Sequence, residues 1–255
     1  MTEASTLSDR VTKLIHAVKT LEPTDREQLT SRLQETGYGP FAVEKSLQRL
    51  TALGYLRSDY RVAHHVRAER GEARKRVAYF LGPKGKALFG YSPDQLRTKR
   101  NRLRLMEGHD GWNLHHNLGV SRFRCYLLNA QDRGLCTFKS KHIGTEFEAG
   151  DRKHRPDYLL VINEFPVYFE YERRNKLSKT VRHARRYWRA WNEHVINDPV
   201  VFVTQHPDHL EDIRQAIWEE LGDTGNYFRF LSEEDYDLFN PNPALLARIV
   251  EPVLP

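Results

Sequence analysis

Three carboxylates flank two neighbouring hydrophobic runs in the stretch RPDYLLVINEFPVYFEYERR, residues 155–174. Asp157 begins the first run, and Glu170 and Glu172 end the second. Because side chains alternate along a strand, Glu170 and Glu172 share one face while Tyr171 points to the other. Two paired strands can therefore bring all three carboxylates together.

Such a cluster raises the pKa values of its own carboxyl groups unless a cation neutralises it. Oxygen ligands suit Mg²⁺, which keeps several waters and can activate one of them against a phosphodiester. Asp157, Glu170 and Glu172 are therefore candidate catalytic residues, with Asp157 and Glu170 as ligands of Mg²⁺. In the alternative interpretation no metal binds, and the carboxylates pair with nearby arginines, Arg155, Arg173 and Arg174.

The segments around this stretch alternate between helical and extended patterns. Helices are predicted over 112–130, 177–192 and 209–221, and strands over 136–143, 157–163, 166–172 and 199–205. The order α-β-β-β-α-β implies a mixed sheet with helices on its faces. The run NYFRFL, residues 226–231, is a candidate further strand.

The predicted helix over 177–192 combines an apolar stripe with a basic surface. The stripe recurs every three or four residues and contains Leu177, Val181, Ala184, Trp188 and Trp191. Arg182 and Arg186 on its flanks either contact DNA phosphates or keep the helix solvated. His183 and Tyr187 share a face, and they either project toward the carboxylates or cover the edge of the cluster.

The first 90 residues predict three short helices followed by a β-hairpin, the arrangement of a winged helix-turn-helix. The third helix, over 40–53, turns apolar residues inward and polar residues outward, as a helix in the major groove requires. Its candidate DNA-binding residues are Lys45, Ser46, Gln48 and Arg49. On the hairpin, the candidate phosphate-binding residues are Arg67, Arg70, Arg74, Lys75 and Arg76. The alternative is a solvated hairpin on a protein-binding module.

Charge is distributed unevenly along the chain. Residues 1–105 contain 21 Lys and Arg against 11 Asp and Glu, a net charge of +10, whereas residues 106–255 carry −4. The basic segment over 93–109, with Arg100 and Arg102, is either a second phosphate-binding surface or a linker that its charges keep soluble. We therefore predict a winged helix-turn-helix over 1–92, a basic linker over 93–109 and a second domain over 110–255.

Composition narrows the class of protein. The apolar runs are far shorter than the roughly 20 residues of a membrane span, and the first ten residues lack the apolar core of a signal peptide. The two cysteines, Cys125 and Cys136, lack the CxxC spacing of a zinc site. We therefore expect a reduced, cytoplasmic protein that makes no membrane contact.

The acidic stretch and its predicted elements resemble the PD-(D/E)xK nuclease fold. By this resemblance Asp157 and Glu170 match the two acidic metal ligands of that fold. The lysine expected two residues after the second acid is Glu172 here, so the group that positions water or stabilises the transition state is absent from its usual place. Substitutes from the following helix, as in some branches of the fold, would be Lys176, Lys179 or Arg182.

A resemblance over nearly the whole chain is to the replication-relaxation family of plasmid and mobile-element proteins. It rests on the winged-helix pattern followed by LHHNLGVSRFRCYLL, RPDYLLV and VYFEYERRNKLSKTVRHARRYW. Where that family commonly has Glu-x-Asp followed by a basic helix with a tyrosine, this chain has Glu170-Tyr171-Glu172 and Tyr187. The resemblance implies an α+β protein with an N-terminal winged helix-turn-helix and a C-terminal PD-(D/E)xK-like mixed sheet.

Three functions follow as hypotheses. The first is a double-stranded DNA-binding protein of a plasmid or mobile element, acting in replication, relaxation or mobilisation, whose nuclease-like domain is degenerate. The second is a metal-dependent DNA nuclease or nickase targeted by the winged helix, and the third is a transcriptional regulator. The missing lysine favours the first, while the carboxylates keep the second open. A relaxase, a replication protein and a second copy of the chain are candidate partners.

Overall fold

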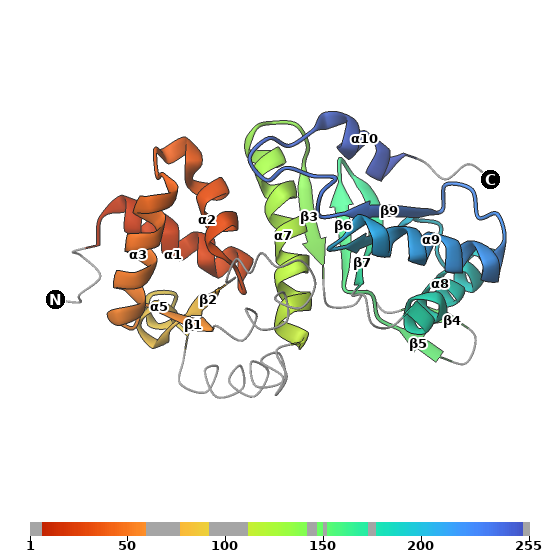
Figure 1. Ribbon diagram of the computed structural model, residues 1–255, viewed down its shortest axis with the longest axis horizontal. Helices are drawn as coiled ribbons and strands as arrows, with labels where there is room; N and C mark the ends of the chain where they lie inside the picture. The colour runs from red at the N-terminus through yellow and green to blue at the C-terminus, as the bar shows by residue number, and fades with distance from the viewer. Residues whose placement is uncertain are drawn as a thin grey trace. The chain divides into compact units, whose positions relative to one another are not determined.

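The computed structural model describes residues 7–59, 77–91, 112–141, 147–149, 152–172 and 177–251 (Figure 1). The chain divides into two compact units, residues 1–125 and 126–255, and the division falls within helix α7 (Trp112–Asp132). The predicted basic linker over 93–109, with Arg100 and Arg102, lies outside the described residues. Both predicted domain boundaries also lie there and stay predictions.

Unit 1, residues 1–125, begins with three helices, α1 (Asp9–Leu21), α2 (Arg26–Leu33) and α3 (Pro40–Ala52). A 3₁₀ turn, η2 (Gln34–Thr36), follows α2. Asp25 caps α2 by accepting the backbone N–H of Gln28 at 2.9 Å. The apolar stripes of the helices meet in one core, which includes Leu14, Val18, Leu29, Val43 and Leu47.

A small antiparallel sheet follows α3. Strand β1 (Leu56–Asp59) pairs with β2 (Ala78–Leu81) in the register Leu56 to Leu81, and helix α5 (Pro83–Leu88) comes next. Thr24 extends this sheet through an isolated antiparallel bridge to Tyr79. The predicted hairpin residues Arg67, Arg70, Arg74, Lys75 and Arg76 lie outside the described residues.

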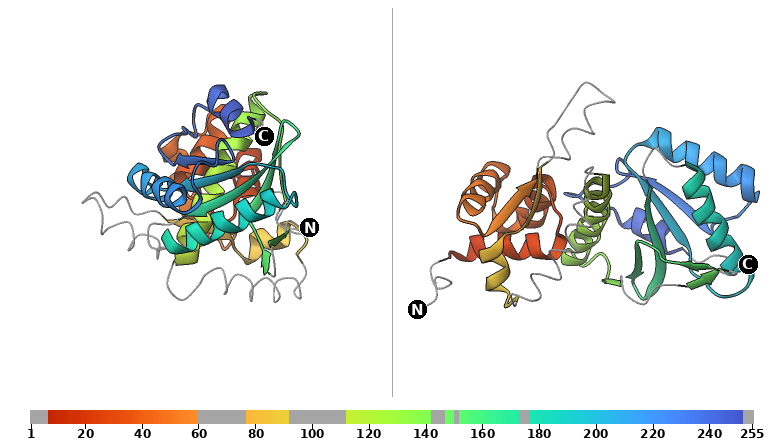
Figure 2. Two further views of the ribbon diagram at one scale, coloured as in Figure 1. Left: turned by 90° about the vertical axis from the view of Figure 1, so that its right-hand side faces the viewer. Right: turned by 90° about the horizontal axis from the view of Figure 1, so that it is seen from below.

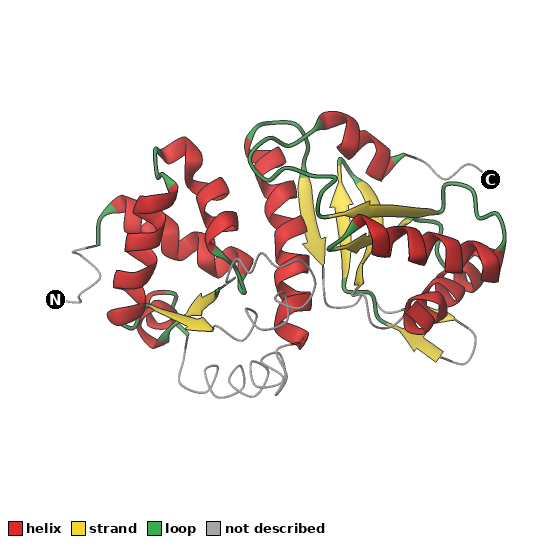
Figure 3. Cartoon of the chain, in the orientation of Figure 1, coloured by secondary structure: helices red, strands yellow, loops and turns green. Residues whose placement is uncertain are grey.

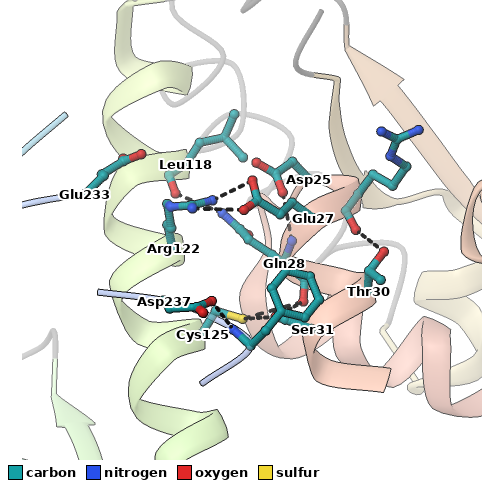
Figure 4. Close-up of polar contacts among 12 residues, drawn as sticks. Asp25, Glu27, Gln28, Thr30, Ser31, Leu118, Arg122, Cys125, Glu233 and Asp237 are labelled. Atoms are coloured by element: carbon teal, nitrogen blue, oxygen red, sulfur yellow. Dashed lines mark hydrogen bonds and ion pairs between the residues drawn. The ribbon is translucent and has the colours of Figure 1, made fainter. Parts of the chain in front are cut away.

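The first part of α7 belongs to unit 1 and holds it together (Figure 4). Leu114 and Leu118 pack against Ala78 and Phe80 of β2. The buried amide of Gln28 accepts a hydrogen bond from the Thr24 hydroxyl at 2.8 Å and donates one to the Leu118 carbonyl at 3.1 Å.

A second polar contact joins the same two helices. The guanidinium of Arg122 makes a bidentate ion pair with Glu27, with N–O distances of 2.9 and 3.0 Å (Figure 4). Because Arg122 is itself buried, this pair fixes the register of α7 on α2 more firmly than an exposed pair would.

Unit 2, residues 126–255, is built on a five-stranded mixed sheet in the order β3-β6-β7-β8-β9. Strands are drawn in yellow in Figure 3. The strands are β3 (Phe138–Lys141), β6 (Tyr158–Ile162), β7 (Phe165–Glu172), β8 (Val200–Thr204) and β9 (Phe228–Ser232). β3, β6 and β7 pair antiparallel, and β7, β8 and β9 pair parallel. The protein is therefore α+β with a mixed sheet, as predicted.

The connections explain this change of direction. β6 and β7 form a tight hairpin whose turn residues, Asn163 and Glu164, have φ of 49° and 72°, the sign that suits the twist of the strands. The parallel strands require long crossovers. Helix α8 (Leu177–Asn192) supplies the one from β7 to β8, and helix α9 (Pro207–Leu221) supplies the one from β8 to β9.

Helices α8 and α9 lie side by side on one face of the sheet (Figures 1 and 2). Their apolar side chains pack on Tyr168, Phe202 and Phe228. On the other side of unit 2, helix α10 (Pro243–Val250) contacts β7, and Tyr126 of α7 donates a hydrogen bond to the Asn242 carbonyl. No helix among the described residues is long and apolar enough to cross a bilayer.

A second small sheet was not predicted. Strand β4 (Phe147–Ala149) pairs antiparallel with β5 (Arg152–His154), which sets Phe147 opposite His154. β4 packs against α8. This short hairpin therefore carries its two end residues, one aromatic and one titratable, to the face of the sheet that α8 covers.

Candidate functional site

The two glutamates at the end of β7 are buried, with 4% of Glu170 and 6% of Glu172 exposed. They share the face of Tyr168, which packs under α8, because alternate residues of a strand point the same way. Asp157 immediately precedes β6 and accepts the backbone N–H of Tyr171 at 2.8 Å. All three candidate acids thus lie at one end of the β6–β7 pair.

Two histidines complete the cluster around Glu170. His154 Nε2, from β5, lies 3.0 Å from Glu170 Oε1. His183 Nδ1, from α8, lies 3.9 Å from Glu170 Oε2 and 3.4 Å from Glu172 Oε1. Three possible metal-ligand atoms, one from each of His154, Glu170 and His183, all lie within 4.8 Å of one another. Asp157 does not belong to this group.

Tyr187, on α8, fixes the orientation of the Glu170 carboxylate. It is fully buried, and its hydroxyl donates a hydrogen bond of 2.8 Å to Glu170 Oε1. The ring of Phe147 packs against both Tyr187 and His154, with centroids 5.1 and 5.2 Å apart. Of the two predicted alternatives for His183 and Tyr187, projection toward the carboxylates is the one that the structure shows.

This arrangement shows that the predicted apolar stripe of α8 was partly wrong. The buried residues of the helix are Thr180, Ala184, Tyr187 and Ala190. Of the predicted stripe, Ala184 is buried, whereas Leu177, Trp188 and Trp191 are only partly buried against the core. The buried face is rotated toward Tyr187, because the glutamate beneath it offers a hydrogen-bond partner that a count of apolar residues does not register.

Burial controls the titration of the cluster. The pKa of Glu170 is raised well above its usual value, first by burial and then by the charges of Asp157 and Glu172. The pKa of His154 is lowered to about 3, first by burial and then by electrostatic interaction with His183 and Arg186. His154 is therefore a neutral imidazole at neutral pH, with a lone pair on one ring nitrogen.

A basic pocket of about 520 Å³ lies beside this cluster. Its described lining residues lie on α8 between positions 178 and 186 and are Ser178, Lys179, Arg182, His183 and Arg186. His183 thus belongs both to the pocket wall and to the group around Glu170. The predicted phosphate-binding residues Arg182 and Arg186 lie together here, next to the candidate acids.

The predicted pairing of the acids with Arg155, Arg173 and Arg174 stays a prediction. Arg173 and Arg174 lie outside the described residues. Among the described residues, Glu170 accepts a hydrogen bond from the Tyr187 hydroxyl and shares one with His154 Nε2. Sequence reasoning gave His154 no role. Its spacing of two residues before Pro156, in a strand only three residues long, carried no signal of its own.

A second surface, on α3, contains the candidate DNA-reading residues. Lys45, Gln48 and Arg49 are exposed. Ser46 is half-buried, and its hydroxyl lies 2.6 Å from that of Tyr38, so it serves partly to hold the helix. Lys45 lies over the ring of Phe41, which is 72% exposed, with its ammonium 4.6 Å from the centroid. The surface thus combines cations with an exposed aromatic ring.

An acid modifies this surface. Glu44 accepts a hydrogen bond from Gln48 at 3.0 Å and pairs with Arg26 at 3.3 Å. Its charge is therefore partly neutralised within unit 1. Of the residues singled out from the sequence on this helix, Lys45 and Arg49 are left as the exposed cations.

Comparison with known protein families matches residues 15–204 to the family described as replication-relaxation. The match covers α2, α3 and the whole acidic cluster, including β7, α8 and β8. It confirms the resemblance seen in the sequence. Neither a search of curated proteins nor a search of solved structures finds a match.

Proposed function

Because the chain belongs to the replication-relaxation family, we propose that it is a double-stranded DNA-binding protein that acts in replication, relaxation or mobilisation of a plasmid or mobile element. The observation that carries the proposal is the exposed face of α3. It presents Lys45, Gln48 and Arg49 on a helix whose opposite face is locked into the core by Val43 and Leu47.

The order of elements in unit 1 supports the same proposal. Helices α2 and α3 are joined by a short turn, and an antiparallel strand pair follows, which is the order of a winged helix-turn-helix. In that arrangement α3 enters the major groove and the strand pair faces the phosphate backbone. Lys45 and Arg49 would then supply phosphate or base contacts.

The test is duplex-DNA binding by the full chain, measured by fluorescence anisotropy across a salt series. If about five phosphates are neutralised, log affinity should fall with log salt at a slope of roughly −4 to −5. The double variant Lys45→Ala/Arg49→Ala should raise Kd at least about tenfold and make the slope shallower by about 2.

A matched control removes two exposed arginines from unit 2, Arg214→Ala/Arg248→Ala, and lowers the net charge equally. It should leave affinity and slope nearly unchanged. Equal losses in both double variants would mean that net charge, and not the α3 face, drives binding, which would overturn the proposal.

For unit 2 we propose a PD-(D/E)xK-like domain that grips DNA through the basic pocket of α8. The support is the main sheet, in which β3, β6 and β7 follow α7 and pair antiparallel, and β8 follows α8 and pairs parallel to β7. Lys179, Arg182 and Arg186 line one pocket beside the carboxylates, where a phosphate backbone would lie.

Mg²⁺ held by Asp157 and Glu170 does not fit the residues that are present. Glu170 faces two imidazoles, which are poor Mg²⁺ ligands, and Asp157 already accepts a backbone N–H. Glu172 adds a negative charge where the nuclease pattern has a lysine. These observations favour DNA binding without Mg²⁺-dependent cleavage, so we expect the domain to be degenerate as a Mg²⁺ nuclease.

Metal-dependent cleavage is the second candidate function, favoured by the proximity of the acidic cluster to the basic pocket. The test is incubation of purified protein with supercoiled plasmid, with and without Mg²⁺ or Mn²⁺. We expect no conversion to nicked or linear DNA with Mg²⁺. Cleavage by the wild type that is lost in both Asp157→Ala and Glu170→Ala would establish the nuclease instead.

A further inference from the structure

The group around Glu170 contains the ligand types of a transition-metal site. It brings together two imidazole nitrogens and one carboxylate, from His154, His183 and Glu170. Imidazole suits Zn²⁺, Fe²⁺, Ni²⁺ and Cu²⁺, whereas Mg²⁺ and Ca²⁺ prefer oxygen ligands alone. Two histidines and a carboxylate on three separate elements leave further coordination positions open for water or another ligand.

The distances are close to those that a common ion would impose. Bonds of about 2.0–2.1 Å place two ligand atoms of a tetrahedral site roughly 3.3 Å apart. His154 Nε2 lies 3.0 Å from Glu170 Oε1, and His183 Nδ1 lies 3.9 Å from Oε2 of the same carboxylate. Small side-chain rotations would therefore bring the three ligand atoms to the spacing of a tetrahedral ion. Glu172 Oε1 lies 3.4 Å from His183 Nδ1, near enough to serve as a fourth ligand.

The buried ring nitrogen Nδ1 of His183 is a second observation that points to an ion at this site. This nitrogen is shielded from solvent and makes no hydrogen bond to any described residue, even though Glu172 lies nearby. Buried polar atoms nearly always have a partner, so such an atom points to an ion or a water that completes it. The atom faces both glutamates, which is the direction a shared ion would occupy.

The surroundings also match those of a metal ligand set. Tyr187 donates to Glu170 and so orients the carboxylate, the role that hydrogen-bonding partners around metal ligands usually have. Phe147 packs against the ring of His154 and restrains it. The basic pocket that His183 lines gives a route from solvent to the cluster.

We propose that His154, Glu170 and His183 bind one divalent first-row transition-metal ion that accepts imidazole ligands, with Zn²⁺ as the reference ion and Mg²⁺ excluded. The inference goes beyond the proposed DNA binding and does not depend on it. The site differs from the Asp157–Glu170 pair expected from the nuclease pattern, because it takes its nitrogen ligands from β5 and α8. An ion there would lie at the end of the pocket of Lys179, Arg182 and Arg186, within reach of a bound phosphate oxygen.

The experiment is titration of the untagged, metal-stripped full chain with Zn²⁺, followed by calorimetry, and with Co²⁺, followed by visible absorption. We expect one ion per chain, Co²⁺ bands that Zn²⁺ abolishes, and no competition from a large excess of Mg²⁺. Binding of neither ion to the wild type at micromolar concentration would overturn the proposal, whatever the variants do.

Variants then assign the ligands. His183→Gln and Glu170→Gln should each weaken Zn²⁺ binding by more than about 100-fold, and Tyr187→Phe by roughly 10–100-fold, since it removes only the orienting hydrogen bond. Far-ultraviolet circular dichroism verifies that each variant is folded. Asp157→Asn should retain binding, and a loss as large as that of His183→Gln would instead assign the ion to the Asp157 side.

His194→Asn is the matched control, because it removes an exposed imidazole at φ 54°, a conformation that asparagine tolerates. It should bind Zn²⁺ like the wild type. If His194→Asn weakens binding as much as His183→Gln does, the ion is held at surface histidines and the proposed site is wrong. DNA binding, measured on the same samples, tests the proposed function separately from this inference.

Discussion

The α3 surface of unit 1 and the Glu170 cluster of unit 2 use polar residues in opposite ways. On α3 the cations stand in solvent above an apolar core, and each can be removed without exposing a buried partner. Around Glu170 the titratable groups are buried and depend on one another, since one carboxylate faces His154, His183 and Tyr187. The difference predicts that substitutions on the α3 surface alter DNA binding alone. Substitutions around Glu170 should also lower the free energy of unfolding.

The largest expected effect comes from cutting the chain before α7. A fragment of residues 1–105 loses Leu114 and Leu118 from the core of unit 1 and leaves the buried amide of Gln28 without its carbonyl partner. We expect it to show no cooperative thermal transition by circular dichroism, while residues 1–132, which keep all of α7, do show one. Equal melting temperatures for the two fragments would show that α7 does not support the α3 surface.

Glu170→Ala should produce the next largest effect. It removes the partner of two buried groups, Tyr187 and His154, at a cost of about 1–3 kcal/mol for each. We expect a loss of about 3 kcal/mol in the free energy of unfolding, measured with urea. Glu148→Ala, at an exposed position of β4, is the control and should stay within about 0.5 kcal/mol. A wild-type value for Glu170→Ala would contradict the interdependence described above.

Unit 1 also contains a buried titratable group, the thiol of Cys125, so the effect of burial on titration can be tested in both units. Burial raises the pKa of Cys125, on α7 beside Ser31, to about 12. Since the folded state holds this proton more tightly than the unfolded state, its contribution to stability is complete below about pH 8.5 and is lost as pH rises toward 12. Between pH 8.5 and 10.5 the wild type should lose about 2 kcal/mol more than Cys125→Ala.

The same shift predicts slow chemistry at that thiol. At pH 8.5 the folded protein holds roughly a thousandth of the Cys125 thiolate present in the unfolded chain. Alkylation by iodoacetamide should therefore be slow until urea is added, as peptide mass spectrometry can follow. Rapid native labelling of Cys125 would show that the first part of α7 opens readily, and would weaken the view of α7 as a firm support.

The smallest expected effect is the stability change in Lys45→Ala/Arg49→Ala. Both side chains are exposed, and alanine favours a helix, so the free energy of unfolding should change by less than about 0.5 kcal/mol. A loss of DNA affinity at unchanged stability is the signature of a surface that acts only through contact. A destabilisation comparable to that of Glu170→Ala would remove the distinction between the two regions.

Much of the fold follows from local pattern. The apolar runs at 157–163, 166–172 and 199–205 and the helical period over 177–192 predicted the mixed sheet and its crossover helix, because burial of one face imposes a period that short segments already show. The acids at the ends of two adjacent strands could likewise be placed together, since a short turn predicted at residues 164–166 makes the strands neighbours, and the structure pairs them as a hairpin. The family could be read from the same motifs.

The composition of the site was decided by tertiary structure. His154 lies in a three-residue strand with no periodicity, and it meets Glu170 only because β4 and β5 fold back under α8. The sequence left two positions open for Tyr187, toward the carboxylates or over the edge of the cluster; the structure buries it fully, and its hydroxyl donates a hydrogen bond to Glu170. The sequence thus determined which acids end the strands. Which groups surround them, and hence whether oxygen or nitrogen ligands face the site, depended on contacts between residues far apart in the chain, and no local pattern encodes those contacts.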